Sequence, residues 1–134
     1  MADFPTLKPA FTMQVLIDPP VNVGSTAKNC NFVVTPMVGG TVKSEPGFLP
    51  AFNGQLASNG NDYIRTDPDG KRLRLDAHTV VKTDTGAVNR NLSQSGDADH
   101  AALENGIFVA SGRFIYEKGQ KPIVDYKVSQ VCKG

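Results

Sequence analysis

Residues 61–87, NDYIRTDPDGKRLRLDAHTVVKTDTGA, decide the fold because they hold two extended runs joined by a turn. Asp67-Pro68-Asp69-Gly70 is typical of a β-turn, with proline at the first central position. From Lys71 to Thr83, apolar and polar residues alternate as in a strand with two unlike faces. One face carries Leu73, Leu75, Ala77, Thr79 and Val81, and the other carries Arg72, Arg74, Asp76, His78, Val80 and Lys82. The stretch predicts an antiparallel hairpin and leaves open which face of its second strand is turned inward.

Further strand signals recur at short intervals, separated by glycine and proline. They cover Phe11–Ile17, Asn31–Val38, Thr41–Lys43, Phe52–Ser58, Ala87–Leu92, Ile107–Glu117 and Pro122–Cys132. The one helical candidate is the short run Asp97–Leu103. Many short strands with almost no helix predict an all-β sandwich or barrel. We favour a small antiparallel lipocalin-like barrel formed by residues 1–134 as one domain, because closure removes exposed edges and leaves room for one small ligand.

Composition narrows the class of partner. The 134 residues carry 14 basic and 13 acidic side chains, a net charge of +1, so nothing in the charge balance favours nucleic acid or an anionic membrane. The N-terminal residues lack the apolar core of a signal peptide, and no apolar run is long enough to span a membrane. We therefore expect a cytoplasmic protein in which Cys30 and Cys132 are reduced thiols.

Several phrases resemble the domain-of-unknown-function 3237 family in their order and spacing. They are Gly39-Gly40-Thr41, Gly60-Asn61-Asp62-Tyr63, Leu75-Asp76-Ala77-His78, Thr83-Asp84-Thr85-Gly86-Ala87, Phe108-Val109-Ala110-Ser111-Gly112 and Val124-Asp125-Tyr126-Lys127-Val128. The resemblance implies a lipocalin-like β-barrel with an interior cavity. It also implies a kinship with fungal helper isomerases and cyclases of secondary metabolism, including a chalcone-isomerase-like activity.

The chain departs from the family pattern in three places. Tyr63 stands where a tryptophan is usual, and His78-Thr79 stands where the family usually has Arg-Tyr. The region between Asn89 and Leu103 is expected to be shorter than in a typical member. We therefore expect a shortened member of the family, and the resemblance to the fungal isomerases and cyclases implies a fungal source. A barrel left incomplete in this way would be stabilised by covering its open edge, so we expect a homodimer.

Two pairs of side chains are the candidate catalytic residues. Asp76 and His78 lie two apart on one strand and therefore project from the same face, where a carboxylate can orient an imidazole for general acid–base catalysis. Tyr63 and Arg65 share a face of the preceding strand and can donate to a developing oxyanion. The alternative is that these residues form only the solvated face of a hairpin, with cross-strand ion pairs.

The expected function is a cofactor-free isomerase or cyclase acting on a small aromatic or polyketide-like metabolite. The alternative is a non-catalytic binding barrel or accessory protein, and a weaker option is an oligomerising scaffold. The substrate-binding candidates are Asn53 and Gln55, which alternate on one strand, Lys82 on the polar face of Lys71–Thr83, and Tyr116 and Tyr126 of the last hairpin. We expect no metal, because two histidines this far apart do not suit a three-ligand site.

Overall fold

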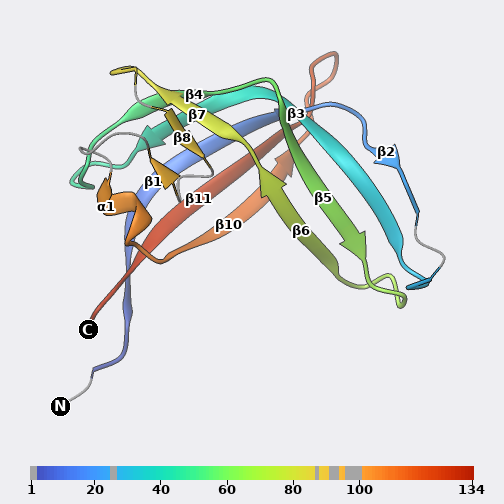
Figure 1. Cartoon of the computed structure of the whole chain (residues 1–134), viewed down its shortest axis with the longest axis horizontal. Coiled ribbons are helices and arrows are strands. Elements are labelled where there is room, and N and C mark those ends of the chain that lie inside the picture. Colours follow the sequence, from blue (N-terminus) through green and yellow to red (C-terminus); the bar gives the residue numbers. More distant parts are fainter. Residues whose placement is uncertain (1–2, 25–26, 87, 91–93, 96–100) are drawn as a thin grey trace.

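The fold is one antiparallel sheet that curls into a half-barrel, as the computed structural model shows in Figure 1. The structure describes residues 3–24, 27–86, 88–90, 94–95 and 101–134. The strands are β1 (Thr6–Ile17), β2 (Val21–Asn22), β3 (Asn31–Ser44), β4 (Asn53–Leu56), β5 (Gly60–Thr66), β6 (Leu73–His78), β7 (Val80–Thr83), β8 (Val88–Arg90), β9 (Gln94–Ser95), β10 (Phe108–Ile115) and β11 (Ile123–Cys132). The predicted all-β, barrel-like class is confirmed.

The long strand β3 divides the sheet into two branches. On one side, β3 pairs with β1, and the order continues through β11 to β10. On the other side, the first half of β3 pairs with β5 and its last residues pair with β4. β6 follows β5, while β7, β8 and β9 follow β4. The sheet therefore ends at β10 in one direction and at the β5–β6 hairpin in another, and Figure 1 shows these two ends facing each other.

A glycine pair lets β3 run continuously past β1. Gly39 and Gly40 have φ angles of +151° and +144°, a region that other residues rarely adopt. The register between β1 and β3 shifts at this point, between Leu16 and Ile17. The sequence predicted two strands on either side of the pair, Asn31–Val38 and Thr41–Lys43, and the structure joins them into one strand from Asn31 to Ser44.

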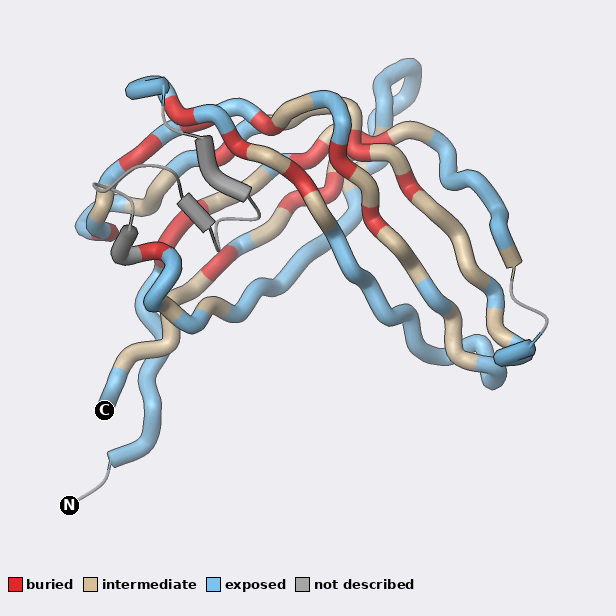
Figure 2. Tube along the Cα trace, in the orientation of Figure 1, coloured by how far each residue is buried: buried red, intermediate tan, exposed pale blue. Residues whose placement is uncertain are grey.

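The packed core occupies one end of the half-barrel, whereas the β5–β6 hairpin is mostly half-buried or exposed (Figure 2). Phe11 is at the centre of an aromatic cluster, with ring centroids 5.8 Å from those of Phe52 and Phe108 and 6.1 Å from that of Phe48. Leu103, from the short helix α1 (Ala101–Glu104), is fully buried in the same core. These side chains close one end of the curled sheet and leave the other end open.

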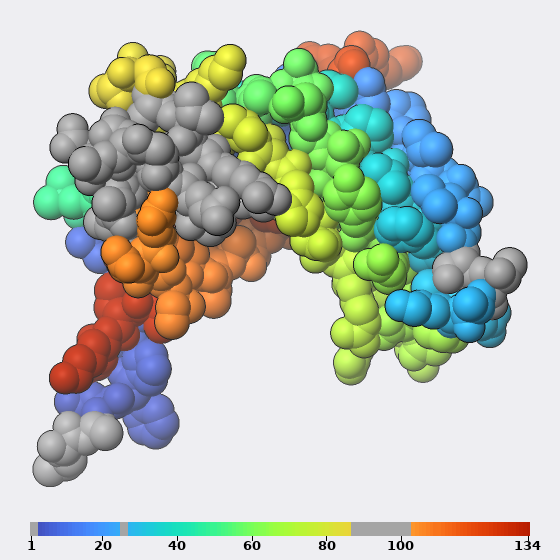
Figure 3. All heavy atoms as spheres, in the orientation of Figure 1, coloured from blue at the N-terminus to red at the C-terminus, as the bar shows by residue number. Residues whose placement is uncertain are grey.

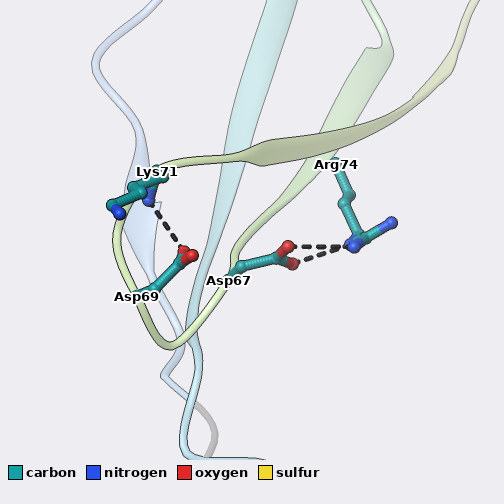
Figure 4. Close-up of polar contacts among 4 residues, drawn as sticks. All are labelled: Asp67, Asp69, Lys71 and Arg74. Atoms are coloured by element: carbon teal, nitrogen blue, oxygen red, sulfur yellow. Dashed lines mark hydrogen bonds and ion pairs between the residues drawn. The ribbon is translucent and has the colours of Figure 1, made fainter.

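The β5–β6 hairpin turns where the sequence predicted it. The Gly70 N–H donates to the Asp67 carbonyl over 2.8 Å, which closes the turn. Beside the turn, the Arg74 guanidinium donates two hydrogen bonds to the Asp67 carboxylate, 2.7 and 2.9 Å long, and the Lys71 N–H donates to Asp69 over 3.0 Å (Figure 4). Arg74 holds the pKa of Asp67 below its ordinary value through these hydrogen bonds.

Two predicted elements differ in extent. The run Lys71–Thr83 was expected as one strand, but it forms β6 and β7, interrupted at Thr79, because β6 pairs with β5 and β7 pairs with β4. The expected helix Asp97–Leu103 corresponds to α1, and residues 97–100 lie outside the described residues. Within the described ranges, no helix is long and apolar enough to cross a membrane.

Candidate functional site

The concave side of the half-barrel holds a cavity of about 620 Å³. It opens between β6 and β10, where the space-filling view in Figure 3 shows a notch in the molecule. Its lining is Met13, Val15, Met37, Leu75, Ala77, Thr79, Val81, Ala110, Gly112, Phe114, Val124 and Tyr126. Such a volume and a predominantly apolar wall suit a small organic molecule.

A smaller cavity of about 250 Å³ adjoins the first one toward the β5–β6 hairpin. The two cavities share Val15, Met37, Phe114, Val124 and Tyr126 in their walls. The smaller cavity adds Asp62 and Ile64 from β5, so the concave surface is continuous from the aromatic core to the hairpin. Asp62 is the carboxylate in this otherwise mostly apolar wall.

Asp62 is only 7% exposed. Strand alternation places it there, since it lies opposite Ala77 of β6 and two residues before Ile64, both of which face the concave side. Its Oδ1 accepts a hydrogen bond of 3.1 Å from the Asp76 backbone N–H. Burial raises the pKa of the Asp62 carboxyl above its ordinary value. The hydrogen bond from Asp76 lowers this pKa and the Asp76 charge raises it, but burial is the largest effect.

Tyr126 of β11 places a phenol in the walls of both cavities. Its ring covers Gly112 of β10, where an added Cβ would lie 2.6 Å from the Tyr126 ring. Burial raises the pKa of the Tyr126 hydroxyl, and the charge of Asp62 raises it further. The hydroxyl therefore stays protonated, as a hydrogen-bond donor beside a buried carboxylate.

Asp76 and His78 lie on the outer face of the sheet. Leu75 and Ala77, which alternate with them on β6, line the cavity instead. The side chains of Asp76 and His78 are 65% and 42% exposed, and His78 Nε2 lies 2.9 Å from Asp76 Oδ1. The expected acid–base pair is thus formed, but it is separated from the cavity by the sheet. We correct the expectation that it faces the ligand, because the apolar face of the strand turned inward.

Tyr63 and Arg65 share this outer face. Tyr63 lies opposite Asp76 in the register, and its ring meets that of His78 edge to face, with centroids 6.0 Å apart. The Arg65 guanidinium lies 4.6 Å from the centroid of the Phe32 ring, which also stacks on Tyr63. The four predicted catalytic residues are therefore neighbours on the convex surface, in an arrangement typical of cross-strand stabilisation.

The five predicted binding residues are divided between the two faces. Tyr126 lines both cavities, and Tyr116 lies at the rim of the smaller one. Asn53, Gln55 and Lys82 are exposed, because the residues that alternate with them on β4 and β7 form the core. These three do not contact the cavity.

Sequence reasoning missed Asp62, although a signal for it was present. Asp62 belongs to the quoted Gly-Asn-Asp-Tyr phrase, and period-two counting from Ile64 places it on the apolar face. The pairing of β5 with β6 then puts it opposite Ala77. In the part of the chain that the structure describes, no three His, Cys, Asp or Glu side chains gather as a metal site would need.

Comparisons with known proteins agree with this fold. Three solved structures are similar over nearly the whole chain: a conserved protein of unknown function from Rhodopseudomonas palustris (20% identity, TM-score 0.80, 97% of this chain and 99% of that chain), a protein of unknown function from Clostridium acetobutylicum ATCC 824 (18%, 0.77, 95% and 99%), and a beta-barrel like protein from Acinetobacter baumannii AYE (16%, 0.77, 98% and 99%). At these identities the likeness shows the fold alone.

No curated protein matches the chain. The expected fungal source and shortened region stay predictions. Residues 5–90, more than half of the chain, match the family model described as "Protein of unknown function (DUF3237)". The chain therefore belongs to the DUF3237 family.

Proposed function

We propose that this protein binds a small, flat and mostly apolar molecule on its concave face and anchors one hydrogen-bond donor of that molecule at Asp62. The observation that carries the proposal is a buried carboxylate in the mostly apolar wall of adjoining cavities of about 620 and 250 Å³. Pockets for small molecules usually combine an apolar wall with a few convergent polar groups.

The hydrogen bonding of Asp62 supports a ligand that donates. A carboxylate can accept about four hydrogen bonds, and the Asp76 N–H uses one of these places. Burying a carboxylate costs free energy unless its oxygens are satisfied, so a phenol O–H or an amide N–H from a ligand would stabilise it. Tyr126, beside Asp62, can donate its hydroxyl to an acceptor on the same ligand.

The side chains that line the cavity favour an aromatic ligand. Its wall is built from aliphatic, methionine and aromatic side chains, and the methionines Met13 and Met37 adapt readily to flat rings. The wall is open between β6 and β10, which leaves a path for entry.

A second candidate function is the cofactor-free isomerase or cyclase expected from the sequence, now with Asp62 as the base. Burial raises the pKa of this carboxyl, which makes Asp62 a stronger base than an ordinary aspartate. In a chalcone-type cyclisation, Asp62 would take the proton of a substrate phenol as its oxygen adds to the enone carbon. Tyr126 would donate a hydrogen bond to the enolate oxygen, and protonated Asp62 would return the proton to the enolate carbon, so atoms and charge balance.

Binding can be tested with 2-naphthol and its methyl ether, 2-methoxynaphthalene, which differ in one O–H donor. The chain contains no tryptophan, so naphthyl fluorescence can be followed without that background. We expect the naphthol to bind more tightly than the ether by about fivefold or more, the advantage of a charge-assisted hydrogen bond over an unmade one.

The matched variants are Asp62→Asn and Asp76→Asn, the same substitution on opposite faces of one hairpin. Asp62→Asn should reduce the preference for naphthol, and Asp76→Asn should retain it. Equal preference in both variants, or no binding of either compound by the wild type, would reject the proposal.

Catalysis can be tested separately, by following the absorbance of an ortho-hydroxychalcone as it cyclises to a flavanone. Asp62→Asn should abolish any protein-dependent rate, and His78→Ala should retain it. The reverse result would place the chemistry on the convex face and reject the role given to Asp62.

A further inference from the structure

In the part of the chain that the structure describes, no strand pairs with the outer edge of β6. Among the described residues, β6 pairs only with β5. The Arg72 carbonyl accepts a hydrogen bond from the Asp67 backbone N–H, and the Asp76 backbone N–H donates to the Asp62 carboxylate. Both bonds point toward β5, so the backbone groups of the even-numbered residues of β6 face β5. Because these groups alternate along a strand, those of Leu73, Leu75 and Ala77 point to the open edge.

This edge also exposes apolar surface. Leu73 and Leu75 are 55% and 47% exposed, and both lie on the concave side of the strand. An edge strand with free backbone groups and exposed leucines readily pairs with another strand unless it is covered. Charged side chains on its outer face decide which partner strand fits it.

We propose that a second copy of this chain pairs with the β6 edge, antiparallel, about a two-fold axis at Leu75. This register places Leu75 opposite the partner's Leu75 and Leu73 opposite the partner's Ala77. It also places Arg74 opposite the partner's Asp76, and the two-fold repeats that contact. Opposite charges therefore face each other twice on the outer surface, while apolar residues meet on the concave one.

The neighbouring registers are less favourable. Only pairings between odd-numbered residues use the free backbone groups, so the alternatives have their two-fold axis at Arg74 or at Asp76. The first places Arg74 opposite the partner's Arg74, and the second places Asp76 opposite the partner's Asp76. Like charges directly opposite each other destabilise a strand pair.

The contacts inside each chain leave capacity for this interaction. Arg74 uses Nε and Nη2 for Asp67, and its guanidinium carries further donors. Asp76 contacts His78 through Oδ1, which leaves Oδ2 for the partner's Arg74. Leu75 and Ala77 line the larger cavity, so the partner's β6 would extend the cavity wall on its open side. The pairing stands whether or not the cavity binds the proposed ligand.

Charge reversal tests the register. In Arg74→Asp, two aspartates face each other at both ionic contacts of the dimer, and in Asp76→Arg two arginines do. Each variant alone should raise the dimer dissociation constant by on the order of tenfold or more in sedimentation velocity. A mixture of the two variants restores both opposite-charge contacts and should form a heterodimer. A monomeric wild type, or a mixture no more associated than its components, would overturn the proposal.

A cysteine test is independent of charge. In a background with Cys30→Ser and Cys132→Ser, Leu75→Cys places two thiols opposite each other, within the Cα separation that a disulfide needs. Mild oxidation should cross-link it to a covalent dimer. Leu73→Cys alone should not cross-link, but a mixture of Leu73→Cys and Ala77→Cys should. Cross-linking of Leu73→Cys alone, or none of Leu75→Cys, would overturn the register.

Discussion

We predict that the same substitution, glycine to alanine, destabilises the fold much more at one residue of the β3 glycine pair than at the other. Gly39→Ala and Gly40→Ala both place a side chain at a φ angle near +150°, +151° and +144° respectively. Such a backbone conformation costs about 1–3 kcal/mol for a residue other than glycine. That cost is shared, so the difference between the variants reports the space around each Cβ.

The two environments differ sharply. A Cβ at Gly39 would meet only the Leu16 side chain, at 3.9 Å, which is ordinary van der Waals contact. A Cβ at Gly40 would lie 2.0 Å from the Gln14 carbonyl oxygen, which belongs to the backbone of β1. β1 is hydrogen-bonded between β3 and β11, so it can move away only if ladder hydrogen bonds are lost. We expect a cost of about 1–3 kcal/mol for Gly39→Ala and of at least about 4 kcal/mol for Gly40→Ala.

Urea unfolding followed by far-ultraviolet circular dichroism measures both values. Gly39→Ala should keep a cooperative transition at a lower urea midpoint. Gly40→Ala should have little or no folded baseline. If the free energies of unfolding of the two variants agree within about 1 kcal/mol, the close approach of β1 and β3 at Gly40 is not what restricts this position, and the reasoning is refuted.

Three further predictions concern the core, the buried acid and the concave wall. Leu103→Ala should lower the free energy of unfolding by about 2–5 kcal/mol in the same assay, because the side chain is fully buried; a change under about 1 kcal/mol would contradict its place in the core. Because Asp62 has a raised pKa in the folded state, wild-type stability should fall as pH rises from the unfolded-state value through the folded one, and Asp62→Asn should remove that fall; an unchanged pH profile would contradict its burial as a titrating acid. Gly112→Ala should displace the Tyr126 ring and weaken 2-naphthol binding, whereas Gly119→Ala, in a distant turn, should leave the affinity unchanged; equal affinities would show that the ring does not contact the ligand.

The hairpin around Asp67–Gly70 could be predicted from local chemistry, because turn residues and period-two alternation are properties of short segments. The sequence also predicted which residues of β6 lie on its apolar face and which lie on its polar face. Which face lies inside depends on the curl of the whole sheet, and apolar burial decides in favour of Leu75 and Ala77. The local pattern therefore predicted the contact between Asp76 and His78 correctly. It could not predict on which side of the sheet this contact lies.

The buried carboxylate was harder to anticipate. Asp62 interrupts the apolar face of β5, and a charged residue in a strand is usually solvent-facing. Its position follows only when the β5–β6 register and the packing of Tyr126 from β11 are combined. Those strands are far apart in the sequence, so the site depends on long-range pairing. The division of Lys71–Thr83 into two strands has the same origin, since β5 and β4 pair with its two halves.

The most direct test of ligand binding on the concave face uses the methionine methyl groups. Met13 and Met37 line the larger cavity, and the chain has three methionines in all. With isotope-labelled methionine methyls, assigned through Met13→Leu and Met37→Leu, saturation with 2-naphthol should shift the signals of both residues. Fluorescence-detected binding that leaves both signals unmoved would place the ligand elsewhere and contradict the central claim.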